Sequence, residues 1–107
     1  MAKKKFLFDW TKFFTKHLVT ATVENIAPTL VVLTFTPVKA VKAFARSIAA
    51  EFTLVGKTVD LLTLDYTLGT VTIRVTVAYV AGAAFDLTFN PVKKGDTVVQ
   101  SVTNNVA

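Results

Sequence analysis

Two heptapeptides of this chain, LTFTPVK at 33–39 and LTFNPVK at 87–93, differ at a single position. When the sequence is aligned with itself at a shift of 54 residues, 17–39 face 71–93 and nine of the 23 positions are identical. Random matching in a chain rich in Thr, Val and Ala gives roughly two identities. We interpret the similarity as an internal duplication of one supersecondary unit. The alternative is two hairpins that converged on strand-forming residues.

Each copy carries the pattern of a β-hairpin. Apolar residues alternate with polar or small residues over 70–79, as in a strand with one buried face, and a shorter alternation covers 19–24. A break suited to a turn follows each run, at Ala27–Pro28 and at Ala81–Gly82. The return strands are expected to bury Val31, Leu33, Phe35, Phe85, Leu87 and Phe89.

The shared ending of the two heptapeptides predicts a change from strand to helix. Thr36 and Asn90 are residue types that cap helix N-termini, and Pro37 and Pro91 follow them at the first helical position. Proline is favoured there because that position needs no amide hydrogen and because its fixed φ suits a helix start. Each hairpin is therefore expected to lead into a helix.

The residues after each joint have helical spacing. The first stripe is Val38, Val41, Ala45, Ile48 and Phe52, and it continues through Val55, Val59, Leu62 and Tyr66. The segment 55–67 is either a continuation of this helix, kinked at Gly56, or a separate element. After the second joint, the spacing of Val92, Gly95, Val99, Val102 and Val106 also fits a helix. The residues KKGD at 93–96 fit equally well a turn before a strand over 97–103. The similarity to the first copy favours the helix over the strand.

The predicted fold class is α+β. Two tandem β-hairpin–helix repeats form an antiparallel sheet backed by helices, and a basic amphipathic helix precedes them. In domain terms, 1–18 is a basic aromatic N-terminal arm or helix. Residues 19–107 form a single domain of two related halves, about 17–53 and 71–107.

The N-terminal segment 3–18, KKKFLFDWTKFFTKHL, is chemically distinct from the rest of the chain. Its aromatic helical face is expected to dock on the sheet or on a partner, through Phe6, Trp10, Phe13, Phe14 and Leu18. Its cations are candidates for polyanion binding, namely Lys3, Lys4, Lys5, Lys12 and Lys16. Three roles fit this pattern: an ordinary docking helix, an arm that contacts nucleic acid such as a packaged genome, and a helix in a membrane interface.

The sequence contains no recognisable active-site motif. The chain has no cysteine and a single histidine, His17, and its only serines, Ser47 and Ser101, lie in no nucleophile motif. The four glycines form no phosphate-binding loop and are expected at joints between elements. We therefore expect no enzymatic activity, no cofactor, no metal site and no small-molecule substrate.

Composition indicates association. Hydrophobic residues make up 52% of the chain and charged residues only 18%, whereas ordinary soluble domains carry about 25% charge. Such a chain is expected to bury apolar surface against copies of itself, a partner or lipid. The hypothesis is a non-enzymatic, self-assembling structural protein, specifically a small virus or phage particle component: a coat, cement or minor capsid protein. The alternatives are a small basic nucleic-acid-binding oligomer and a peripheral membrane protein anchored by its N-terminal helix. The expected location is the virion if the protein is viral, and otherwise the cytoplasm.

Overall fold

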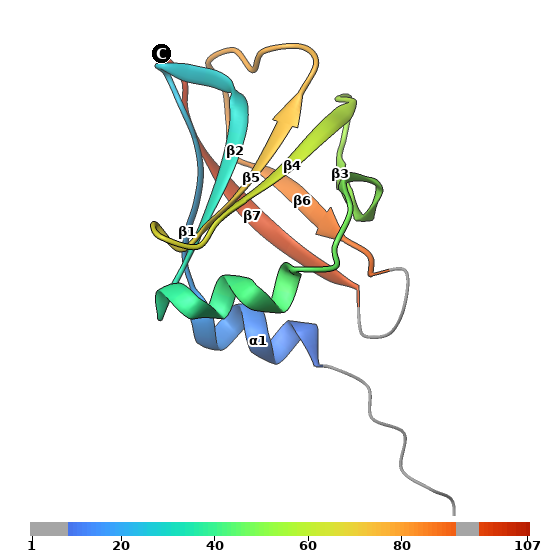
Figure 1. Ribbon diagram of the computed structural model, residues 1–107. Helices are drawn as coiled ribbons and strands as arrows, with labels where there is room; N and C mark the ends of the chain where they lie inside the picture. Colours follow the sequence, from blue (N-terminus) through green and yellow to red (C-terminus); the bar gives the residue numbers. More distant parts are fainter. Residues whose placement is uncertain (1–8, 92–96) are drawn as a thin grey trace, which may run out of the picture.

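A computed structural model describes residues 9–91 and 97–107 of the chain and shows a mostly β fold. Seven strands form one curved, nearly closed sheet in the order β3-β6-β7-β1-β2-β5-β4 (Figure 1). Every neighbouring pair is antiparallel except β1 and β7, which are parallel. The elements are α1 (Trp10–His17), β1 (Leu18–Glu24), β2 (Ala27–Phe35), the 3-10 helices η1 (Val38–Phe44) and η2 (Ala49–Glu51), β3 (Phe52–Leu54), β4 (Val59–Asp65), β5 (Thr70–Val75), β6 (Phe85–Phe89) and β7 (Val98–Asn105).

The predicted α+β class with two hairpin–helix repeats is wrong. The first hairpin is present, because β1 and β2 pair antiparallel across the turn after Glu24. The second hairpin is not: β5 pairs with β2 and β4, whereas β6 pairs with β3 and β7. The cause is the connection over 76–84, which leaves β5 and crosses to the other half of the sheet, where its Tyr79 amide and Val80 carbonyl are bonded to other elements. The similar heptapeptides therefore end two strands that occupy different places in one sheet.

The joints after the two similar strands also differ from the prediction. Leu33, Phe35, Leu87 and Phe89 are buried as expected. Thr36 caps no helix, however, because Pro37 occupies the cap position of η1 without a side-chain hydrogen bond, and the Thr36–Pro37 peptide is cis. The Asn90 side chain instead accepts a hydrogen bond from the Thr97 hydroxyl at 3.1 Å. Residues 92–96, where the second helix was expected to begin, lie outside the described residues.

The long helices expected after the joints are replaced by short 3-10 helices and strands. The helical stripe from Val38 becomes η1 and η2, which end where β3 begins at Phe52. Gly56 lies in the turn between β3 and β4 with a φ of 76°, so 55–67 does not continue the helix. The C-terminal segment is strand β7, whose inward positions Val98 and Val102 are buried.

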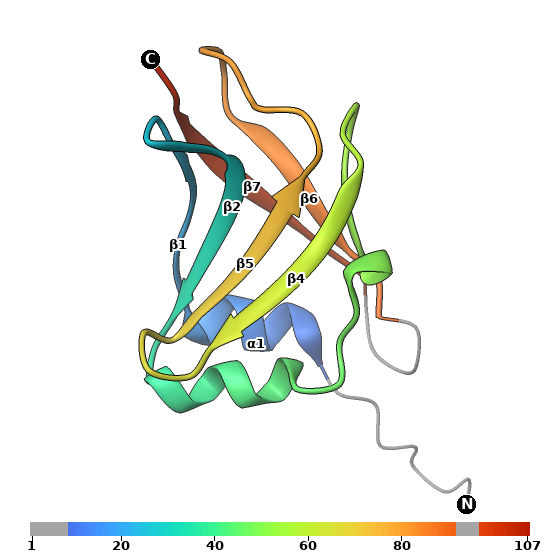
Figure 2. The same ribbon diagram turned by 45° about the horizontal axis from the view of Figure 1, so that its top comes forward.

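An aromatic cluster fills the end of the sheet that α1 and η1 cover (Figures 1 and 2). The Trp10 ring lies 4.9 Å from Phe44 and 4.7 Å from Phe89, measured between ring centroids, and Phe52 stacks on Phe89 at 4.8 Å. Edge and offset contacts of this kind add to the stabilisation that burial itself provides. Within 9–91 and 97–107, the opposite end of the sheet carries turns and loops and no helix, so the two ends present different surfaces.

Candidate functional site

The helical end of the molecule is basic. Of the seven Lys and Arg in the described residues, five lie exposed in α1 and around η1, namely Lys12, Lys16, Lys39, Lys42 and Arg46, and the other two are Lys57 and Arg74. The acidic groups of this end are held in local hydrogen bonds. The Asp9 carboxylate caps α1 by accepting from the Lys12 amide at 3.0 Å, and buried Glu51 accepts from the Ile48 amide at 3.1 Å. We refer to the five cations and the helices that carry them as the basic helical end.

A groove of about 440 Å³ runs between α1 and η1 at the basic helical end. Its walls are Phe13, His17, Pro37, Lys39, Ala40 and Ala43. The Phe13 and His17 rings are 4.8 Å apart, and His17 Nδ1 is within 2.9 Å of the Thr36 carbonyl oxygen. Ala43 also borders a second hollow of about 210 Å³ beside Trp10 and Arg46. The basic helical end is therefore hollowed along the line where the two helices meet.

The residues singled out from the N-terminal segment fall on two sides of α1. Trp10 and Phe14 are only 7% and 3% exposed, and Phe13 and Leu18 are half-buried against the same core. Lys12 and Lys16 are exposed on the same helix. Phe6, Lys3, Lys4 and Lys5 lie outside the described residues. Because Trp10 and Phe14 are inside the core, they are not available to lipid in this structure.

A second surface, at the opposite end of the sheet, was missed in the sequence. Four large apolar side chains are strongly exposed there: Ile26 (94%), Val55 (88%), Val77 (64%) and Val80 (74%). They come from the β1–β2 turn, the β3–β4 turn and the β5–β6 loop, which lie at the same end of the sheet in both views, with the β5–β6 loop between the two turns (Figures 1 and 2). We call these four residues the apolar rim. The feature of the sequence that could have indicated this surface is the nine-residue run TVAYVAGAA at 76–84, which carries no charge.

The loops of the apolar rim are tied to one another and to the sheet. Lys57 Nζ donates to the Ala78 carbonyl oxygen, the Tyr79 amide donates to the Pro28 carbonyl oxygen, and Asn104 Nδ2 donates to the Val80 carbonyl oxygen, each at 2.9 Å. These bonds hold the backbone and leave the Val77 and Val80 side chains directed to solvent. The rim is therefore a fixed surface, which loses little conformational entropy when it is covered.

Tyr79 lies in the β5–β6 loop of the rim, and its ring contacts two other side chains. Its ring stacks on Phe85 with centroids 4.2 Å apart and planes 8° apart, and the Lys57 ammonium lies 4.6 Å from its centroid. Its hydroxyl is buried and has no hydrogen-bond partner among the described residues. Burial raises the pKa of this hydroxyl to about 12, because the phenolate would be poorly solvated there.

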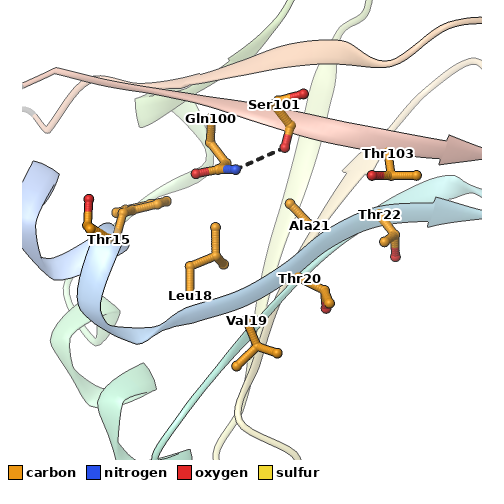
Figure 3. A pocket seen from close by; sticks show the side chains of 10 residues that line it. Thr15, Leu18, Val19, Thr20, Ala21, Thr22, Gln100, Ser101 and Thr103 are labelled. Atoms are coloured by element: carbon orange, nitrogen blue, oxygen red, sulfur yellow. Dashed lines mark hydrogen bonds between the residues drawn. The ribbon is translucent and has the colours of Figure 1, made fainter.

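A third surface is the opening between β1 and β7 (Figure 3). The two strands pair only over Thr22–Glu24 and Thr103–Asn105, and they separate toward α1, leaving a hollow of about 420 Å³. Leu18 and Gln100 point into this hollow, and Gln100 Nε2 donates to the Ser101 carbonyl oxygen at 3.0 Å. The described lining consists of apolar and neutral polar side chains.

The described residues contain no cluster of metal ligands and no helix suited to crossing a membrane. Within 9–91 and 97–107, no three His, Asp or Glu side chains gather as metal ligands. The one ion pair in this part of the chain joins Arg74 to Asp60 at 2.9 Å on the exposed side of β4 and β5, and the arginine's hydrogen bond lowers the pKa of Asp60. None of the helices described has the length and apolarity needed to cross a membrane.

Comparisons with known proteins give no relative: no family model, no curated protein and no solved structure matches this chain significantly. Function is therefore inferred from the basic helical end and the apolar rim.

Proposed function

We propose that this protein is a non-enzymatic structural protein that assembles with copies of itself through the apolar rim. The class of assembly we propose is a virus or phage particle, with this chain as a small coat, cement or minor capsid component. The observation that carries the proposal is the exposure of Ile26, Val55, Val77 and Val80 on three connected loops. Soluble monomers rarely leave contiguous apolar patches of more than a few hundred Å² in water.

The energetics of the rim favour contact between subunits. Full burial of one large aliphatic side chain contributes about 1.5–3 kcal/mol. Four such side chains on a surface that is already fixed can offset a substantial part of the entropy that association costs. The rim also carries little charge to desolvate, since Lys57 is already bonded to the β5–β6 loop and exposed Glu24 is bonded to Asn105 at 2.9 Å.

The two ends of the subunit carry different surfaces, one apolar and one basic, and this arrangement is suited to the wall of a particle. A subunit that meets its neighbours through the apolar rim leaves the basic helical end, with its five cations, facing away from that contact. Such a surface attracts polyanions, and a packaged genome is one. This polarity supports a particle component over an isolated globular protein.

Sedimentation equilibrium of the wild-type chain over a concentration series tests the proposal. We expect a dimer or larger species at micromolar concentration. Its mass should persist at high salt, because apolar contacts are not screened as charge contacts are. A monodisperse monomer, free of detergent and partner, would contradict assembly. Co-flotation of such a monomer with lipid vesicles would instead favour the membrane alternative.

The second candidate function, a small basic nucleic-acid-binding oligomer, is favoured by the basic helical end. Deletion of 1–5 removes Lys3, Lys4 and Lys5 and leaves every core residue described above in place. If these lysines contact phosphates, the salt dependence of binding becomes shallower by up to about three counterions. An unchanged slope in the truncated protein would exclude the arm from the contact.

A further inference from the structure

We infer that the groove between α1 and η1 binds the bases of single-stranded nucleic acid while the lysines beside it neutralise the phosphates. The inference rests on the nucleic-acid contact proposed above. It adds a specific site and the kind of nucleic acid that the site accepts. Proteins that bind single strands without sequence preference combine a positively charged groove with aromatic side chains on which bases stack.

The groove has an aromatic wall that is held in place. Phe13 packs on Phe35 and Phe44, with ring centroids 5.8 Å and 5.7 Å away, so its ring is supported from behind. His17 contacts Phe13 and is fixed by its bond with the Thr36 carbonyl. The facing wall holds small side chains, Ala40 and Ala43, which leave room for a planar group. A base that enters finds a π surface already oriented for stacking.

Lys39 lines the groove, and three more exposed lysines are carried by the two helices that form it. Lys12 and Lys16 are one helical turn apart on α1, and each directly precedes a groove residue, Phe13 or His17. On the η1 side, Lys39 lines the groove itself and Lys42 precedes Ala43. Within the described part of the chain, no acidic side chain lines this groove.

The combination of lysines with an aromatic groove favours binding of a single strand over binding of a duplex. Phosphates carry the charge that the lysines would neutralise, and the walls between the lysines are mainly apolar. In a duplex the base faces are already stacked on one another and cannot enter such a groove. In a single strand they are free to do so.

The test compares two oligonucleotides of equal length and charge, about 12 nucleotides long, a size within the range of single-strand sites. One is oligo(dT), and the other has abasic sugars in place of the nucleosides. We expect the wild-type chain to bind oligo(dT) at least about fivefold more tightly by fluorescence anisotropy, which is the lower end of what one stacked base contributes.

Ala43→Leu fills the groove without changing the charge. We expect this variant to lose the preference for oligo(dT) and to bind the abasic strand as the wild type does. Ala45→Leu is the matched control, because Ala45 is exposed at the end of η1 and borders neither hollow. Should Ala43→Leu fail to fold, Phe13→Leu removes the π surface while retaining an apolar side chain, and it should likewise reduce the preference.

The outcomes separate this inference from the functions it builds on. Equal wild-type affinity for the two strands, or an oligo(dT) preference that survives in Ala43→Leu, overturns the groove site and leaves phosphate contact standing. Failure to bind either strand overturns the groove and the nucleic-acid contact together. Self-assembly through the apolar rim is unaffected by any of these results.

Discussion

The Lys57 ammonium donates a hydrogen bond to the Ala78 carbonyl oxygen at 2.9 Å, and this bond joins the β3–β4 turn to the β5–β6 loop. The same ammonium lies 4.6 Å from the centroid of the Tyr79 ring. A hydrogen bond from a charged donor and a cation–π contact thus act on one loop. Their effect is that Val55 and Val77, which lie in different loops, belong to one fixed surface.

Lys57→Met should therefore weaken self-association although all four rim side chains remain. We expect the free energy of unfolding to fall by about 1–2 kcal/mol, because the Ala78 carbonyl loses its charged donor. The measurements are urea unfolding and sedimentation velocity. Lys42→Met is the control, since Lys42 is an exposed cation at the opposite end. Equal association of the two variants would show that the bond does not organise the rim.

Trp10→Ala should destabilise the fold strongly. The Trp10 side chain is 7% exposed and contacts Phe44 and Phe89, so its removal leaves a large cavity in the aromatic cluster. We expect a loss of about 3–5 kcal/mol in the free energy of unfolding. Thr11→Ala, at an exposed neighbour on the same helix, should change little. Equal unfolding midpoints for the two variants would mean that α1 does not dock in solution.

Alanine substitutions at Gly69 and Gly82 should differ in their effect on stability. Gly69 ends the β4–β5 turn with a φ of 73°, and a Cβ there would lie 3.0 Å from the Phe35 carbonyl oxygen. Gly69→Ala should therefore cost more than about 1 kcal/mol of stability. Gly82 has no such φ and its nearest neighbour is 3.8 Å from an added Cβ, so Gly82→Ala should be neutral or stabilise by about 0.4–1 kcal/mol. The measurement is the thermal unfolding midpoint of each variant. Equal midpoints for Gly69→Ala and Gly82→Ala would contradict this account of the β4–β5 turn.

Tyr79→Phe should stabilise the protein by about 1–2 kcal/mol at neutral pH, because the buried hydroxyl has no partner among the described residues. The substitution should also flatten the alkaline limb of the stability curve. The folded pKa of about 12 exceeds the ordinary value of 10.0, so this group's contribution is fully present below pH 10 and is lost as the pH rises toward 12.

Chemical unfolding at several pH values from neutral to alkaline measures both effects. Tyr66→Phe is the control, because Tyr66 is exposed in the β4–β5 turn. If the wild type and Tyr79→Phe lose stability in parallel above pH 10, the hydroxyl is not buried in solution.

Local patterns predicted several strands and failed where neighbours in space decide the structure. The alternation over 70–79 indicated a strand, which is confirmed only for Thr70–Val75, since Val77 lies in the following loop and is exposed. The pattern from 19 to 35 indicated the β1–β2 hairpin, which is confirmed, although its turn lies at 25–26 and not at Ala27–Pro28. The spacing of Val55, Val59, Leu62 and Tyr66 fits a helix equally well, but Gly56 turns the chain and β4 pairs with β5. In β7, half-buried Gln100 interrupts the apolar alternation, because its position faces the opening beside β1.

The candidate surfaces were predictable only in part. The basic and aromatic composition of 3–18 indicated a two-sided helix, and the structure places Lys12 and Lys16 on its exposed side. The apolar rim could not be derived from spacing. Ile26, Val55 and Val80 are far apart in the sequence and share one end of the molecule only because three loops reach the same end of the sheet. The groove has the same origin, because α1 and η1 are separated in the sequence by β1 and β2 and line one groove only in the folded chain.

The most direct test of assembly through the apolar rim is the native mass of Val80→Asp beside that of Ile48→Asp, measured by sedimentation velocity at micromolar concentration. Both substitutions place one negative charge on an exposed apolar position, but Ile48 lies near the basic helical end. We expect Val80→Asp to be a folded monomer, while Ile48→Asp keeps the mass of the wild-type assembly. Val80→Asp that assembles as the wild type does, or a wild-type chain that is itself monomeric, would contradict assembly through the rim.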